Sequence, residues 1–163
     1  MARKKKTNNV VTQAESIGYK GEVTLTLMHG NKRVRKIKSH NIGKAPLFQY
    51  LMYCLTGTLI SIKIPRYLRV FNSQNQELTT RIIPSTGTPS YEFSDDEASA
   101  VITFNVSSTA LVSLNDLKIF KLYSGENSTQ SLNPSAEISI ENAISIDDDS
   151  SLVVAWKMTI SNK

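Results

Sequence analysis

The side chains that could take part in catalysis are few and lie far apart in the sequence. His29, His40 and Cys54 are the residue types best suited to act as a general base or a nucleophile. His29 lies in a predicted turn and His40 at the end of a predicted strand, while Cys54 lies in the most apolar segment, where a thiol behaves as a small core residue. No G-x-S-x-G, H-E-x-x-H or C-x-x-C motif occurs. We therefore expect no catalytic residues and a protein that is not an enzyme.

Gly43-Lys44 follows a predicted strand and precedes a predicted helix, as the phosphate-binding P-loop does. The match fails at two positions, because Lys38 stands where that motif has its first glycine and Ala45 stands where it has Ser or Thr. We interpret the pair as a turn between a strand and a helix, and we expect no nucleotide cofactor.

Two acidic runs, Asp95 to Glu97 and Asp147 to Asp149, supply the oxygen ligands that hard cations prefer. Neither run has the alternating spacing and the glycine of a calcium loop, so we interpret both as solvated turns. The single cysteine excludes an internal disulfide and a zinc site built from several cysteines. We therefore predict no metal site and no cofactor.

The strongest local feature is a cluster of cations. Five basic residues fall within seven positions at 32–38, and four more are consecutive near the start. The predicted partner-binding residues are Arg3, Lys4, Lys5, Lys6, Lys32, Arg33, Arg35, Lys36 and Lys38. No aromatic residue lies among these cations to stack on bases, and no recognition helix carries them. Contact with an acidic protein surface is favoured, while non-specific contact with nucleic acid and a merely solvated strand stay open.

Charge is divided unevenly along the chain, whose net charge is +5. Residues 1–81 hold 15 Lys and Arg against 3 Asp and Glu, a net of +12, and residues 82–163 hold 4 against 11, a net of −7. Two explanations follow: a basic face for nucleic acid, or complementary faces through which identical subunits meet.

The elements that position the central cations are a predicted hairpin and a helix. Val23, Leu25 and Leu27 alternate with polar residues, and a second strand follows at 32–39 after a Gly-Asn turn. Val34 and Ile37 in that second strand are three apart, so we expect a bulge or an edge position.

A short helix is predicted at 46–56, opened by a proline and closed by Gly57. It is apolar nearly all round, so we expect one side on the sheet and the other at an interface with a neighbouring subunit. The predicted interface residues are Phe48, Tyr50, Leu51 and Tyr53.

Most of the remaining chain has the period-2 pattern of strands. Strands are predicted at 59–64, 67–71, 101–106 and 117–123, with a polar excursion at 72–99 that holds one short strand near 80–83. A last hairpin is predicted from 138–146 and 152–160. About eight strands predict a mainly β protein, a single β-sandwich or jelly-roll-like domain at 19–163 with one short buried helix and an extended basic arm at 1–18.

The segment from Gly21 to Gly57 resembles the opening of small structural proteins of short-tailed bacteriophage virions, particularly of crAss-like phages. The resemblance lies in the hairpin with its basic second strand, in the break His40-Asn41-x-Gly43, and in the apolar helix that ends in Cys54-Leu55-x-Gly57. It covers about a quarter of the chain. It implies a virion component present in many copies, either a ring, collar or tail subunit or a capsid-attached protein, and it brings no catalytic residues.

The expected function is that of a non-enzymatic structural subunit that forms a homo-oligomer and binds other virion proteins. We expect no export signal, no membrane-spanning segment and no small-molecule substrate, and we place the protein in the virion after synthesis in the host cytoplasm. The alternatives are a non-specific nucleic-acid-binding module, a capsid-attached decoration or fibre protein, and a glycan-binding protein. The last is weakened because aromatic residues are scarce and Trp156 lies on the inward face of its predicted strand.

Overall fold

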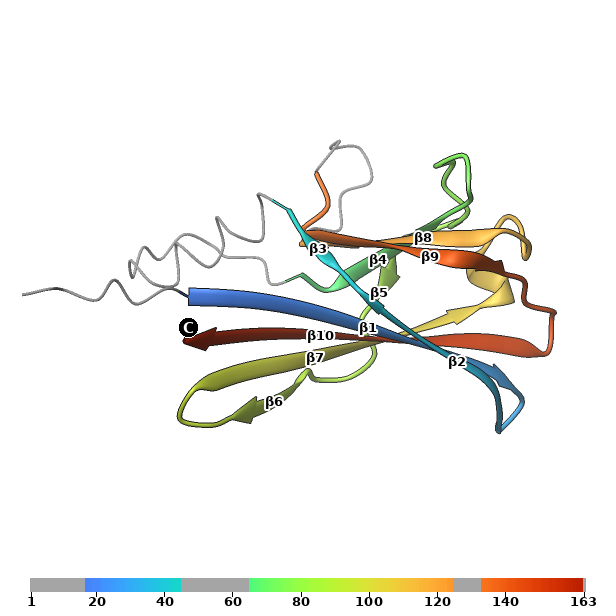
Figure 1. The fold of residues 1–163 in the computed structure, drawn as a ribbon. Coiled ribbons are helices and arrows are strands. Elements are labelled where there is room, and N and C mark those ends of the chain that lie inside the picture. The colour runs from blue at the N-terminus through green and yellow to red at the C-terminus, as the bar shows by residue number, and fades with distance from the viewer. Residues whose placement is uncertain (1–16, 45–64, 125–132, 163) are drawn as a thin grey trace, which may run out of the picture.

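The computed structural model of this chain describes residues 17–44, 65–124 and 133–162, which form two antiparallel five-stranded sheets (Figure 1). Sheet A has the order β2-β1-β10-β7-β6 and sheet B the order β3-β9-β8-β4-β5. The strands are β1 (Ile17–His29), β2 (Lys32–His40), β3 (Ile42–Gly43), β4 (Tyr67–Phe71), β5 (Ile83–Pro84), β6 (Ser90–Phe93), β7 (Glu97–Ser107), β8 (Leu117–Tyr123), β9 (Ala136–Ile144) and β10 (Ser150–Asn162). One 3₁₀ turn, η1 (Ser108–Ala110), is the only helical element in these three ranges. The prediction of a mainly β protein is confirmed.

Several predicted features lie outside the described residues. The helix at 46–56, its interface residues and Cys54 belong to this group, as do the strand at 59–64 and the cations at positions 3–6. The predicted arm overlaps the described part only at Ile17 and Gly18. These two residues already belong to β1, where they pair with the end of β10.

The first hairpin forms as predicted. β1 and β2 pair across a turn at Gly30, whose φ of 55° lies in the left-handed region that glycine adopts at low cost. The register shifts where Leu27 opposes Arg35 and Met28 opposes Arg33, so Val34 is the additional residue of a bulge in β2. β2 is also the edge strand of sheet A, so both alternatives drawn from the spacing of Val34 and Ile37 are confirmed.

The core lies between the two sheets. In sheet A, Val23, Trp156 and Ile102 stand side by side on β1, β10 and β7, and all three are at most 1% exposed. Leu68 and Phe120 of sheet B face them and are fully buried. Burial of each large apolar side chain contributes about 1.5–3 kcal/mol. The hydrophobic effect in this shared layer is therefore the main interaction that holds the two sheets together.

The predicted last hairpin is wrong, because β9 and β10 belong to different sheets. β9 pairs with β3 and β8 in sheet B, whereas β10 pairs with β1 and β7 in sheet A. Both strands direct an apolar face toward the same core, so their alternation is the same whether they pair or face each other. The segment between them therefore crosses from one sheet to the other.

The excursion at 72–99 is more regular than predicted. It holds two short strands, β5 and β6, instead of one, and β7 already begins at Glu97. The described part of the chain thus has ten strands, where about eight were predicted. β6 pairs with β7 and forms the second edge of sheet A.

Asn41 fixes the place where the chain leaves β2 for β3. Its backbone N–H donates to the carbonyl of Gly21, 3.0 Å away, and its side chain lies over Gly21, where a Cβ atom would collide with the amide. The amide group hydrogen-bonds the Tyr19 hydroxyl, and its oxygen accepts from Nε1 of Trp156. Asn41 thus lies at the predicted break at 40–43, between β2 and β3. There it supplies the acceptor that the buried indole N–H of Trp156 requires.

Candidate macromolecular interface on sheet A

The central basic cluster lies on the exposed edge strand β2. Residues 32–36 are all exposed, and among the described strands β2 pairs only with β1. The five cations of this strand, which we call the basic edge, make no ion pair with any residue that the structure describes; they are Lys32, Arg33, Arg35, Lys36 and Lys38.

The alternation of side chains along β2 places these cations on both faces of sheet A, and the bulge at Val34 brings Arg33 to the face of Lys36 and Lys38. Lys36 and Lys38 oppose Thr26 and Thr24, and these threonines alternate with core residues of β1, so both lysines lie on the outer face. Arg35 opposes Leu27 and therefore lies on the opposite side. The basic edge is thus not a flat array of five charges, and Val34 at its centre is 61% exposed.

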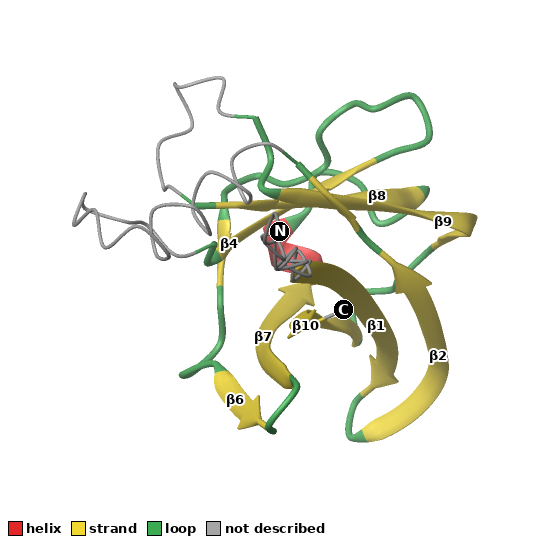
Figure 2. Cartoon of the chain, turned by 60° about the vertical axis from the view of Figure 1, so that its left-hand side comes forward, coloured by secondary structure: helices red, strands yellow, loops and turns green. Residues whose placement is uncertain are grey.

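A groove of about 340 Å³ runs beside the basic edge on the outer face of sheet A. Sheet A is curved, with β2 and β6 at its two ends, so side chains from four of its strands line the groove (Figure 2). Lys36, Lys38 and His40 contribute from β2, Glu22 from β1 and Lys157 from β10. The lining carries charges of both signs, which suits the groove to binding a charged partner.

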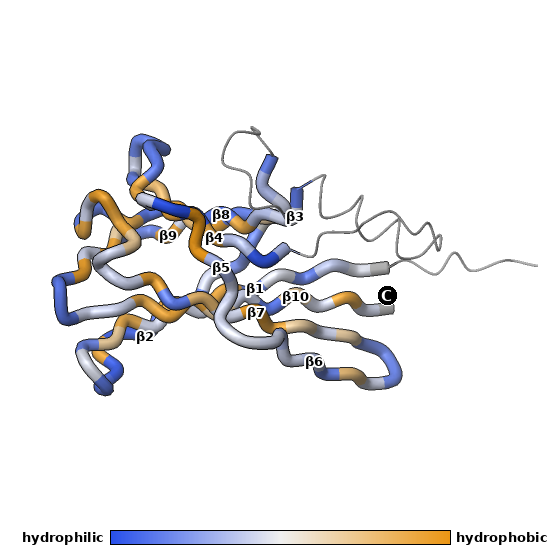
Figure 3. The backbone as a smooth tube through the Cα atoms, turned by 180° about the vertical axis from the view of Figure 1, so that it is seen from behind, coloured by the Kyte–Doolittle hydropathy of each residue, from blue (hydrophilic) through white to orange (hydrophobic). Residues whose placement is uncertain are grey.

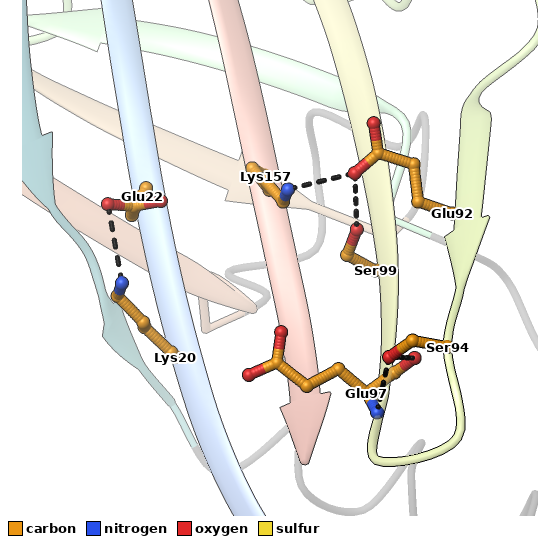
Figure 4. Close-up of polar contacts among 7 residues, drawn as sticks. All are labelled: Lys20, Glu22, Glu92, Ser94, Glu97, Ser99 and Lys157. Atoms are coloured by element: carbon orange, nitrogen blue, oxygen red, sulfur yellow. Dashed lines mark hydrogen bonds and ion pairs between the residues drawn. The ribbon is translucent and has the colours of Figure 1, made fainter.

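On the outer face of sheet A, ion pairs neutralise charged residues of β1, β6 and β10 (Figure 4). Lys157 Nζ lies 3.0 Å from Glu92 Oε2, which also accepts a hydrogen bond from the Ser99 hydroxyl. The bond from Lys157 holds the pKa of Glu92 below its ordinary value. Lys20 and Glu22 approach to 3.6 Å on β1. Glu92 is therefore already paired within the subunit, in contrast to the cations of the basic edge.

The β6 edge carries a feature that the sequence did not reveal, a pair of exposed aromatic rings. Tyr91 and Phe93 are 52% and 78% exposed, and their rings stack with centroids 6.4 Å apart. Next to them, Asp95, Asp96 and Glu97 are exposed in the turn into β7, where Ser94 Oγ accepts from the Glu97 N–H. Two aromatic residues two positions apart in a polar segment were the available signal. We call β6 with this turn, residues 90–97, the acidic edge.

The two halves of the chain do not separate into two faces. In sheet A, β1 from the basic half of the sequence pairs with β10 from the acidic half. The run Asp147 to Asp149, also from the acidic half, lies beside the turn between β1 and β2. There the N–H of Gly30 donates to the Asp149 carbonyl at 3.3 Å. The division of charge between the halves of the sequence is therefore not kept at this tip, where both charges mix. Charge is separated instead between the two edges of sheet A.

At the same tip a histidine, a serine and an aspartate come together, but not as a catalytic triad. Nδ1 of His29 lies 3.4 Å from Ser150 Oγ and 3.7 Å from Asp147 Oδ1, so one ring nitrogen meets both partners. A triad needs the acid and the nucleophile on different ring nitrogens. A hydrogen bond from Ser150 lowers the pKa of Asp147, with a smaller effect from His29. The three residues join two turns that come from opposite ends of the chain.

The remaining candidates have structural roles. Gly43 lies in β3, and Lys44 pairs with Glu137 on β9 at 3.3 Å, so this pair joins strands of sheet B and does not form a phosphate loop. Trp156 is fully buried, as its position on the strand predicted.

Within the described ranges, no three His, Cys, Asp or Glu side chains lie close enough to hold a metal ion. The same ranges contain no helix with the length and apolar character of a membrane span.

Comparison with protein-family models, with curated proteins and with solved structures finds no match for this chain.

Proposed function

We propose that this protein is a non-enzymatic structural subunit with a β-sandwich body, which binds an acidic protein surface through its basic edge. The observation that carries the proposal is the edge strand β2, on which five cations lack an ionic partner among the described residues. Cations and bulges on an edge strand also prevent unwanted pairing of sheets. The charged groove beside β2 extends the surface beyond the edge itself.

The resemblance at 21–57 supports placing this subunit in the tail, collar or ring of a bacteriophage virion, with other virion proteins as partners. In its described part, this segment contains the β1–β2 hairpin and the crossing at Asn41. The basic arm at 1–18, the buried helix near 46–56 and its interface residues belong to the same proposal. They would supply further docking surface.

Nucleic-acid binding is the competing function, and the division of the cations between two faces of the sheet weighs against it. Because the register places Arg33, Lys36 and Lys38 on one face and Arg35 on the other, at most about three phosphates could be met by one face of β2. Stacked bases would also require aromatic residues among the cations, and β2 has none.

Binding to two polyanions tests the proposal. Poly-L-glutamate stands in for an acidic protein surface, and duplex DNA tests the competing function. The triple variant Arg33→Ala, Arg35→Ala, Lys36→Ala is compared with a control of equal charge change, Arg66→Ala, Arg81→Ala, Lys118→Ala, whose side chains lie away from the basic edge.

We expect the wild type and the control to bind poly-L-glutamate at low salt and the β2 variant to lose at least tenfold in affinity. Equal affinity of all three proteins would refute the role of the basic edge. DNA retained on filters at about 0.15 M salt, with a salt slope that falls by about 2 in the β2 variant because Arg33 and Lys36 share one face, would establish nucleic-acid binding in its place.

A further inference from the structure

The two edges of sheet A are complementary in charge and alike in build. Each has exposed apolar side chains with charges around them: Val34 lies between Arg33 and Arg35, and Tyr91 and Phe93 lie beside the acidic turn. An apolar centre within a charged rim is the usual composition of a protein interface. β2 and β6 are both edge strands, and they stand at opposite ends of the curved sheet (Figure 2).

We infer that the acidic surface met by the basic edge is the acidic edge of a second copy of this chain. The inference rests on the proposed function and names its partner. Asp95, Asp96 and Glu97 make no ion pair with the described residues, so the turn offers three free carboxylates to the cations of β2. Two basic edges would repel each other, so a contact between identical surfaces is disfavoured.

The aromatic pair gives this contact an apolar component. Tyr91 and Phe93 oppose Ala100 and Ala98 of β7, so their rings rise beside small side chains and stay exposed. Buried aromatic rings are the residues that most often dominate binding at protein interfaces. Glu92 between them is held by Lys157, which leaves the rings and the turn as the groups available to a partner.

The positions of the two edges determine how copies are arranged. Glu92 stands in line with Lys20 of β1 through Ser99 and Thr159, whereas Lys36 stands in line with Thr26, six residues further along β1. At about 3.4 Å per residue, the two charged regions are offset by roughly 20 Å along the strands. The turn between β1 and β2 and the turn between β6 and β7 accordingly lie at opposite ends of the molecule (Figure 3). Contact between different surfaces joins copies head to tail, each displaced along its neighbour, which produces a ring or a helical array.

Two charge-reversal variants test this arrangement. The first carries Arg33→Glu, Arg35→Glu and Lys36→Glu in the basic edge, and the second carries Asp95→Lys, Asp96→Lys and Glu97→Lys in the acidic edge. Sedimentation velocity over a concentration series measures association of each variant alone, of their 1:1 mixture and of the wild type. Near-ultraviolet circular dichroism of the buried Trp156 verifies that each variant is folded.

We expect the wild type to associate, each variant alone to associate at least tenfold more weakly, and the mixture to recover association with alternating copies. The double variant Tyr91→Ser, Phe93→Ser should also weaken association at least tenfold while poly-L-glutamate binding stays unchanged. A monomeric wild type, or a mixture that stays monomeric, would overturn the inference. If the basic edge still binds poly-L-glutamate in that case, the proposed function stands and only the identity of the partner is refuted.

Discussion

The buried contact between Asn41 and Trp156 permits a quantitative prediction. Trp156 is 0% exposed, and its Nε1 donates to the amide oxygen of Asn41. Asn41→Ala removes this acceptor and also one hydrogen-bond partner of the Tyr19 hydroxyl. A buried donor left without an acceptor costs about 1–3 kcal/mol, so we expect the free energy of unfolding to fall by about 2–3 kcal/mol.

A double-mutant cycle separates this hydrogen bond from other effects of the substitution. Trp156→Phe removes the N–H and part of the ring, and the resulting cavity and lost contact should cost about 1–3 kcal/mol. In that background Asn41→Ala leaves no indole donor unpaired. We therefore expect the losses of unfolding free energy in the two single variants to add up to about 1–2 kcal/mol more than the loss in the double variant.

The assay is urea unfolding followed by far-ultraviolet circular dichroism, because Trp156 is the only tryptophan and its fluorescence disappears in two of the proteins. Asn105→Ala, on the exposed outer face of β7, is the control and should change the free energy of unfolding by less than about 0.5 kcal/mol. Losses at positions 41 and 156 that add within about 0.5 kcal/mol would show that the two side chains do not interact, and the reasoning would be refuted.

Three further predictions concern stability. Because the pKa of Asp147 is lowered, by a hydrogen bond from Ser150 first of all, its contribution to stability is present above its ordinary pKa of 3.8 and is lost as the pH falls below it. Asp147→Asn should therefore lower Tm at pH 7 but not at pH 2, and equal shifts at both would contradict this. Burial raises the pKa of Tyr123 above 10.0, so stability should fall as the pH rises past 10, and Tyr123→Phe should reduce that fall in Tm; an unchanged alkaline profile would contradict it. Gly21→Ala forces the Asn41 side chain to move and should cost about 1–3 kcal/mol in urea unfolding, whereas a neutral effect would show that this site has room for a methyl group.

Features that depend on neighbouring residues in the chain were predictable from the sequence. The alternation of Val23, Leu25 and Leu27 defined β1 and its buried face, and β8 has the predicted bounds of 117–123. The three-residue spacing of Val34 and Ile37 predicted the bulge, because an additional residue must shift the period-2 pattern.

Features that depend on which strands meet were not predictable in the same way. The alternation of β9 and β10 indicates a face toward the core, and the two sheets share that core, so it could not show that the strands separate. β6 was missed because four residues provide only two repeats of the pattern. The division of charge between the sequence halves did not carry over to the surface, because β1 and β10 pair along 13 residues and so bring the halves together. The basic edge could be located, but its counterpart depended on knowing that β6 is the opposite edge.

Cross-linking between isotopically distinct copies tests the central claim most directly. A carbodiimide joins a lysine to a carboxylate in contact with it, and a mixture of ¹⁴N- and ¹⁵N-labelled protein distinguishes links between copies from links within one. The account predicts mixed-isotope links from Lys32, Lys36 or Lys38 to Asp95, Asp96 or Glu97. Links from these lysines confined to single copies, for example to the neighbouring Asp147 to Asp149 run, would contradict it.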